Sequence, residues 1–564
     1  MKIKKCVQKV IGRSIFDSRG IPTVEIDLKT TIGTVRASCP SGASTGSQEA
    51  LELRDGDSSN CMGKSVQKAL IGVEELANSL ISTDMHITDQ EAIDKHMIEL
   101  DGTKNKSRVG ANSILPMSIC FARLGAKYMQ MQEWVYLQSL MQRSDMKSCA
   151  SCSSTAPNLK CALINSQRSK HLPNGSVLVS NTEIDSELKE STKKKEDSGE
   201  KEKSNDEKKP NDSEQNEKEE KGSEQNKKVK EDLESEKKET GEKKDSESEK
   251  KEADKRKAKE EDADKKSKQK EELKTEKTCK DALLKKKQKP TIPKIFFNII
   301  NGGRHADNGL FVQEIMVSFD GHTPYNVLTS ASEFIWALKS IVKKKYKLTG
   351  VGDEGGFAPP ISSLEEGLDL IQEAAKASGI TPSIALDVAA SEFYKDGKYN
   401  IGWKTKDKYV SRFEMIDYYV KIINKYKVAM IEDPFDEKDY EGWEVFMKEA
   451  NTLGTKVVGD DLIVTNPELI KKAGEEKLCN VALIKMNQIG TITETIQAVK
   501  EARKQGMKVM ASHRSGETED IFLAHLAVGL SADYLKAGSL CRTERVSKYN
   551  ELVRIFEKFS IDTI

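Results

Sequence analysis

The chain has 564 residues, with 91 Lys or Arg and 91 Asp or Glu, so its formal net charge is zero. This balance gives no electrostatic reason to expect nucleic acid or an anionic membrane as a partner. The sequence contains no run of 18 apolar residues and begins without the apolar segment of a secretory signal. The ten Cys are dispersed, which is typical of reduced thiols, so we expect a cytoplasmic protein with no membrane partner.

The charged residues are concentrated in one segment. Residues 191–290 contain 33 basic and 31 acidic residues and no Phe, Tyr or Trp, whereas the remaining 464 residues contain 118 charged ones. A segment of that composition cannot bury enough apolar surface to fold. We therefore predict an N-terminal domain at 1–141, a low-complexity insert at 142–290 that is largely disordered or a solvated helix, and a second domain at 291–564.

Two interpretations of the insert stay open. Residues 251–287 favour a solvated helix, because opposite charges recur three or four positions apart. Cys149, Cys152 and Cys161 are either free thiols or part of a zinc cluster, although no second pair of ligands accompanies them. The composition indicates no particular partner for the insert.

The first domain combines strands with helices. Residues 24–28 alternate apolar and polar side chains, and a turn leads into 35–39, which predicts an antiparallel hairpin. Apolar residues then recur at helical spacing in 66–80 and 111–128. Strands followed by helices predict a small α+β domain.

The second domain repeats one unit, in which a short apolar run ends in a polar residue and an amphipathic helix follows. Six such runs are spaced by 23 to 45 residues, which suits parallel strands with crossover helices and predicts a (β/α)8 barrel. The strand ends carry Asp387, Glu432, Asp460, Lys485, His513 with Arg514, and Lys536.

These strand ends predict a catalytic rim, because the carboxyl ends of barrel strands meet at one mouth. Any single charged residue there can equally be the first solvated residue after a buried strand. Three carboxylates in succession, Asp387, Glu432 and Asp460, need a cation to stay ionised together, and oxygen ligands suit Mg²⁺. The cations opposite them then predict an anionic substrate.

An acid and a base can be assigned at this rim. Lys485 lies beside the predicted metal and other cations, which would disfavour its ammonium form and allow it to act as a base; a salt-bridged rim lysine is the alternative. Glu354 lies in a glycine-rich loop, and Glu314 can pair with it, raise its pKa and keep it protonated. His305 follows a double glycine after the apolar run 295–300.

The segment 41–46 is rich in small residues. One interpretation is a helix cap, with Thr45 and Gln48 starting a helix at 49–54. The other is a mobile lid in which Ser44 supplies an oxygen ligand.

Together these stretches resemble the enolase family over about 415 residues. The resemblance implies an enolase-type modified (β/α)8 barrel preceded by a small α+β domain, with first strands that depart from strict βα order. It also implies reversible dehydration of 2-phosphoglycerate to phosphoenolpyruvate, two Mg²⁺ per active site and a homodimer. The matching motifs are 16–20, 41–46, 100–103, 105–107, 301–305, 313–314, 352–359, 386–387, 431–434, 460–462, 485–490 and 512–520.

The resemblance also assigns roles to residues. It makes Asp387, Glu432 and Asp460 ligands of the first Mg²⁺ and Ser44 a ligand of the second. Lys485 becomes the base and Glu354, oriented by Glu314, the acid. The implied substrate contacts are His305, Glu314, Ser512, His513, Arg514, Ser515 and Lys536, with His305 and Glu314 also near the chemistry.

Four departures from the family pattern stand outside these positions: Ile21 replaces a usual Asn, Pro116 interrupts a usually continuous helix, Leu540 replaces a usual Pro, and the insert replaces a short connector. They leave two alternatives to a working enolase. One is a catalytically silent scaffold that binds partners through the insert, and the other is an acid-sugar dehydratase, which would lack the Ser44 lid. The complete set of acid, base and ligands favours the enzyme.

Overall fold

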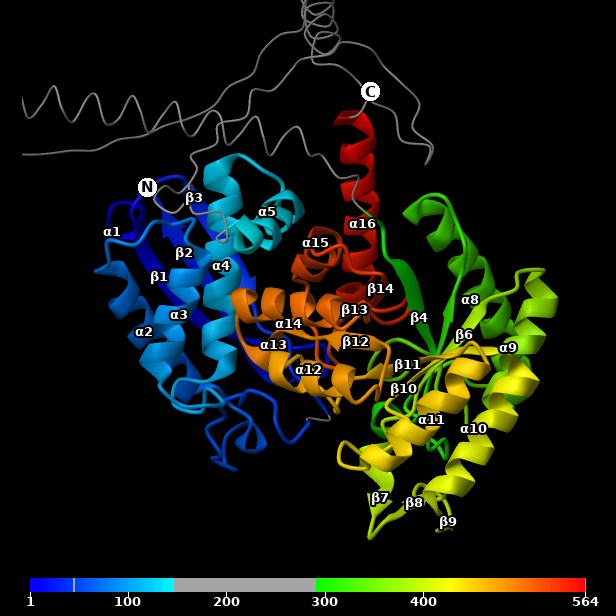
Figure 1. Cartoon of the computed structure of the whole chain (residues 1–564). Coiled ribbons are helices and arrows are strands. Elements are labelled where there is room, and N and C mark those ends of the chain that lie inside the picture. The colour runs from blue at the N-terminus through cyan, green and yellow to red at the C-terminus, as the bar shows by residue number, and fades with distance from the viewer. Residues whose placement is uncertain (44–45, 147–290, 563–564) are drawn as a thin grey trace, which may run out of the picture. The chain divides into compact units, whose positions relative to one another are not determined.

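The computed structural model describes residues 1–43, 46–146 and 291–562 (Figure 1). Ser44, the three cysteines of the insert and the helix predicted at 251–287 lie outside these residues. Within the described ranges, every helix is too short or too polar to cross a membrane.

The N-terminal part is a three-stranded antiparallel sheet covered by helices. The predicted hairpin is confirmed, and it pairs Leu28 with Val35. Helix α4 packs on β2 and β3, and α2 packs on β1 (Figure 1). The elements are α1 (Ile3–Cys6), β1 (Val7–Phe16), β2 (Pro22–Thr30), β3 (Gly33–Ser38), the 3-10 helix η1 (Cys61–Gly63), α2 (Gln67–Ile81), α3 (Gln90–Asp101), α4 (Ala111–Met129) and α5 (Glu133–Met146).

The prediction of a helix at 49–54 is wrong, because no helix forms there. Backbone N–H groups of this segment donate to distant carbonyls instead of to the preceding turn: Ala50 to Gln488 at 2.8 Å and Leu51 to Asn105 at 2.8 Å. The segment is therefore not a helix, and its shape depends on chain segments that are remote in sequence.

The second part is a closed barrel in the order β10-β11-β12-β13-β14-β4-β5-β6. All six predicted apolar runs form strands of it, as does the run at 295–300. Strand β5 pairs antiparallel with β4 and β6, while the other pairings are parallel, so the modified barrel is confirmed. The strands are β4 (Lys294–Asn301), β5 (Glu314–Ser318), β6 (Ser383–Asp387), β10 (Val428–Glu432), β11 (Lys456–Gly459), β12 (Val481–Ile484), β13 (Lys508–Ser512) and β14 (Tyr534–Lys536).

Helices surround the barrel (Figure 1). They are α8 (Pro324–Tyr346), α9 (Leu364–Ser378), α10 (Arg412–Tyr426), α11 (Tyr440–Thr452), α12 (Pro467–Glu475), α13 (Met486–Ile489), α14 (Ile492–Lys504), α15 (Phe522–Gly529) and α16 (Thr543–Asp562), with 3-10 helices η2 (Gly303–His305) and η3 (Ala390–Phe393). A small sheet, β7 (Tyr394–Lys395), β8 (Lys398–Asn400) and β9 (Tyr409–Val410), follows η3. A separate apolar cluster, which includes Phe296, Met316, Met430 and Leu483, is contributed by the barrel strands.

Candidate active site

Strand register places three buried carboxylates side by side at one rim. Asp387 pairs with Glu432 on the parallel neighbour β10 and with Glu314 on the antiparallel neighbour β5. Glu314 is the first residue of β5. Because β5 runs in the opposite direction, its beginning reaches the rim where the other strands end.

Lys536, the last residue of β14, lies among these carboxylates. Its Nζ is 2.8 Å from Glu432, 3.1 Å from Asp387 and 3.3 Å from Glu314. Burial acts against the ammonium, but the three carboxylates outweigh it and raise the pKa of Lys536 well above its ordinary value. Burial, and then the neighbouring Asp387, raise the pKa of Glu432.

Lys485 pairs with Asp460, which follows the last residue of β11. Gln488 holds the second carboxylate oxygen of Asp460 by a hydrogen bond of 2.8 Å. The loss of the Lys485 proton expected beside a bound metal stays a prediction. Burial disfavours the charged amine, but the contact with Asp460 outweighs it and raises the pKa of Lys485.

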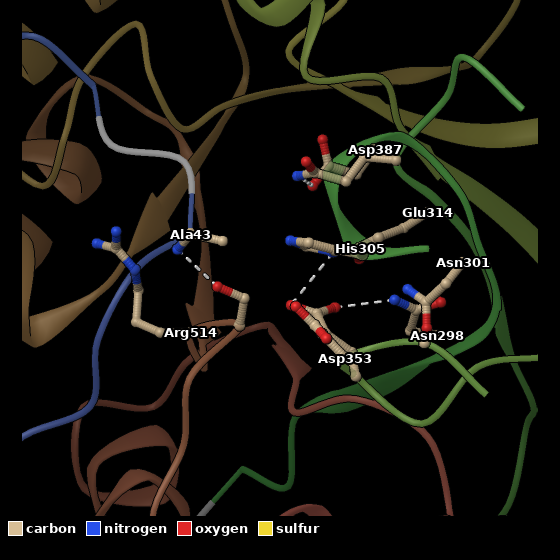
Figure 2. Close-up of polar contacts among 12 residues, drawn as sticks. Ala43, Asn298, Asn301, His305, Glu314, Asp353, Asp387 and Arg514 are labelled. Carbon is tan, nitrogen blue, oxygen red and sulfur yellow. Dashed lines mark hydrogen bonds and ion pairs between the residues drawn. The ribbon is translucent and has the colours of Figure 1, made fainter. Parts of the chain in front are cut away.

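Glu354 is buried between two imidazoles and an amide. Asn298 donates a 2.8 Å hydrogen bond to it, His305 Nδ1 lies 3.6 Å away, and His513 Nε2 lies 3.4 Å away. Figure 2 shows Asn298, His305 and Glu314 gathered at this position. Asn298 was not predicted as a site residue. It is a polar residue within the apolar run 295–300, and this exception to the pattern could have indicated a role at the site.

Glu314 and Glu354 form a buried pair whose pKa values are shifted in opposite directions. Burial and the neighbouring Glu354 raise the pKa of Glu314 well above its ordinary value. Burial alone would raise the pKa of Glu354, yet its contacts with His513 and His305 lower it well below that value. The two directions differ because Glu354 contacts both His305 and His513, whereas Glu314 contacts His305 alone of the two.

The segment after β13 and the N-terminal part supply the groups that lie across from His305 and Glu314 (Figure 2). Arg514 contacts Glu49 at 2.8 Å, and the Ser515 hydroxyl accepts a 2.7 Å hydrogen bond from the Ala43 N–H. Figure 2 shows Ala43 and Arg514 across from His305 and Glu314. The Ser512 hydroxyl donates to the His513 carbonyl at 3.0 Å. Every site residue predicted from the sequence, except Ser44, lies among the described residues.

The sequences of the barrel and of the N-terminal part match two family models. "Enolase, N-terminal domain" matches residues 7–137, and "Enolase, C-terminal TIM barrel domain" matches residues 289–563. The chain belongs to the enolase family. The resemblance inferred from separate motifs is thereby confirmed across both folded parts of the chain.

Enolase-family domains typically bind Mg²⁺, and the residues here fit that ion. Asp387, Glu432 and Asp460 follow adjacent strands, are buried, and offer oxygen ligands only. Burial, Asp387 and Asp460 all raise the pKa of Glu432, so a bound cation would stabilise the ionised carboxylates.

Among the described residues, two groups have potential ligand atoms that all lie within 4.8 Å of one another: His305 with Glu314 and Glu354, and Asp433 with Asp460 and Asp461. Asp387, Glu432 and Asp460 do not form a third such group. The first includes an imidazole, which suits Mg²⁺ poorly. In the second, Asp433 already accepts hydrogen bonds from the N–H groups of Asp460 and Asp461. The strand-end carboxylates therefore remain the better set.

Sequence reasoning missed several residues that orient this enolase-family rim. Gln488 joins Asp460 to Glu49, and Arg545 joins the end of β13 to the loop before Glu354. Gln488 lies in the motif after Lys485 and could have been singled out. Arg545 lies in an ordinary amphipathic helix, where nothing distinguishes it.

Proposed function

We propose that this chain catalyses the Mg²⁺-dependent, reversible dehydration of 2-phosphoglycerate to phosphoenolpyruvate. The observation that carries the proposal is that two sets of buried contacts lie on adjacent strand ends of one barrel: Lys485 with Asp460, and Lys536 with the carboxylates that include Glu314. Lys485 contacts Asp460, and Lys536 connects Glu432, Asp387 and Glu314. A base and an acid separated by cation-binding carboxylates suit removal of a proton and a hydroxide from adjacent carbons.

The proposed roles follow from this geometry. Lys485 removes the proton beside the substrate carboxylate, and Glu354 transfers to the departing hydroxide the proton that it shares with Glu314. Asp387, Glu432 and Asp460 would hold Mg²⁺, which would supply positive charge where the substrate carboxylate gains negative charge. The proposed substrate-binding groups are His305, Ser512, His513, Arg514, Ser515 and Lys536.

The remaining assignments are also proposals. Ser44 is a ligand of a second Mg²⁺, the active unit is a homodimer, and the reaction serves glycolysis and gluconeogenesis in the cytoplasm. They rest on membership of the enolase family. The domain limits at 141 and 291 are proposed on the same basis and on composition.

The test is phosphoenolpyruvate formation from 2-phosphoglycerate by the purified full chain, with Mg²⁺ and with a chelator. A second protein replaces residues 147–290 with a flexible linker of about 15 residues, which leaves α5 and β4 intact. We expect turnover by both proteins and none in chelator. If both are folded but inert with Mg²⁺, the chain is a scaffold and the proposal is wrong.

A further inference from the structure

Arg545 is a fully buried cation on α16. Its guanidinium donates to the carbonyl oxygens of Arg514 at 2.6 Å, Ser515 at 2.7 Å and Asp353 at 3.2 Å. It therefore connects the end of β13 to the loop that carries Glu354. Five N–H donors in a rigid plane make such a connection possible, and lysine cannot reproduce it.

The same guanidinium contacts Nδ1 of His513. Arginine only donates hydrogen bonds and does not lose its proton in proteins. The Nδ1 atom that faces it must therefore be the acceptor, so the ring proton of a neutral His513 is on Nε2. This tautomer follows from the chemistry of the partner.

The Nε2 atom of His513 faces Glu354, the proposed acid. It lies 3.4 Å from Oε2 of Glu354 and has no hydrogen-bond partner among the described residues. Lys536 and Arg545 are the cations that act on the ring, and Glu354, flanked on its far side by His305, is the anion. Burial, which outweighs the attraction of Glu354, lowers the pKa of His513 to about 4. The ring is therefore neutral at physiological pH.

We infer that Arg545 is a positioning residue that holds His513 as the Nε2–H tautomer, with this N–H directed at Glu354. With the other tautomer, a nitrogen lone pair would face a carboxylate and repel it. The inference rests on the proposed function for its role in turnover, where a fixed donor keeps Glu354 in place for proton transfer. The tautomer itself can be measured independently of any activity.

The experiment is long-range ¹H–¹⁵N NMR of the full chain labelled at histidine. The chain has only seven His, and the His513→Asn variant assigns the signal by its disappearance. In the wild type we expect a neutral Nε2–H ring between about pH 6 and pH 8. An Nδ1–H ring or an imidazolium there would overturn the inference, and this measurement needs no Arg545 variant to fold.

Arg545→Met removes the donor to Nδ1, so we expect the ring to shift toward the Nδ1–H tautomer or the imidazolium. Arg545→Lys, which keeps one donor group, should restore part of the wild-type pattern. An unchanged Nε2–H pattern in Arg545→Met would overturn the inference.

Arg542→Met is the matched control. Arg542 lies just before α16 and binds the carbonyl oxygens of Gly352 and Ser18, and none of its hydrogen bonds reaches His513. We expect the wild-type tautomer in this variant, and an equal shift would mean general loosening and contradict a specific role for Arg545. If the wild-type protein has the Nε2–H ring but forms no phosphoenolpyruvate, the proposed function is wrong and the inference about the tautomer stands.

Discussion

Asp94 of α3 accepts two hydrogen bonds from Thr493 in the first turn of α14, one from its N–H at 2.9 Å and one from its hydroxyl at 2.6 Å. The Ser118 hydroxyl accepts a third, from the Ile492 N–H at 3.0 Å. Side chains of the N-terminal part thus satisfy amide groups that begin a barrel helix and have no partner within it. Because α14 follows the Lys485–Gly490 segment, this contact also fixes the end of the segment that carries the proposed base.

The first prediction concerns the pH dependence of this contact. Asp94 is buried among neutral donors, and burial raises its pKa to about 6. The folded protein therefore binds more protons than the unfolded chain between about pH 4 and pH 6, so stability falls as pH rises through this window. Relative to Asp94→Asn, the free energy of unfolding should fall by about 3 kcal/mol between pH 4 and pH 7. Urea unfolding at each pH measures the difference.

Thr493→Val is the control, because it removes one donor to Asp94 but leaves the carboxyl group. Its unfolding free energy should keep the falling trend with pH. A difference between wild type and Asp94→Asn that is constant with pH would contradict the raised pKa.

The second prediction concerns an ion pair between the same two parts of the chain. Arg123 Nη2 lies 2.7 Å from Asp520, and a second nitrogen lies 2.8 Å from the other carboxylate oxygen. Burial opposes the carboxylate, but Arg123 outweighs it and lowers the pKa of Asp520. The contribution of the Arg123–Asp520 pair to the free energy of unfolding is therefore present at neutral pH and is lost as pH falls below about 4. Arg123→Met should cost about 3–5 kcal/mol at pH 7 and less in acid, by urea unfolding.

The control is Lys95→Met, which removes an exposed pair with Glu99. Pairs of this kind contribute less than about 1 kcal/mol. Equal losses in the two variants would show that the Arg123–Asp520 pair behaves as a surface contact.

Much of the barrel could be predicted from sequence because its parallel strands are short, apolar and punctuated by polar ends. The spacing placed Asp387, Glu432 and Asp460 at strand ends without any knowledge of the register. Sequence could not show that β5 runs antiparallel to its two neighbours, which is what brings Glu314 to the rim. Strand β1 was missed because its side chains are largely exposed and do not form an apolar pattern.

The errors at the site have a common physical cause. The helix expected at 49–54 is replaced by bonds to Gln488 and Asn105, which are distant in the chain. The opposite pKa shifts of Glu314 and Glu354 could not be predicted because sequence did not bring His305 and His513 together on one carboxylate. Local pattern predicts the elements, whereas ionisation depends on which elements meet.

The third prediction tests the proposed base. Lys485→Ala should reduce turnover of 2-phosphoglycerate by about 10³-fold or more, because general base catalysis contributes about 10²–10⁴-fold. Mg²⁺ binding, measured by calorimetry, should persist, since Asp387, Glu432 and Asp460 remain. The variant should also lose exchange of the substrate proton with deuterated solvent, which reports the base step alone.

Two comparisons sharpen this test. Lys508→Ala removes an exposed lysine at the opposite end of β13 and should leave turnover unchanged. Glu354→Gln should lose turnover but keep solvent exchange, because the proposed acid acts after proton removal. Undiminished exchange in Lys485→Ala would rule out Lys485 as the base.

The fourth prediction concerns removal of the metal. In the described structure the Lys536 ammonium compensates Asp387, Glu432 and Glu314. Lys536→Met leaves these buried carboxylates with Mg²⁺ as their main compensation, so chelation should destabilise this variant more than the wild type. We expect the rise in Tm on adding Mg²⁺ to be larger by about 2 °C, which corresponds to about 2 kcal/mol for roughly 400 folded residues. Thermal unfolding in Mg²⁺ and in chelator measures it for both proteins. Lys508→Met should behave as the wild type, and an equal rise in Lys536→Met would mean that the ammonium and the metal do not share these carboxylates.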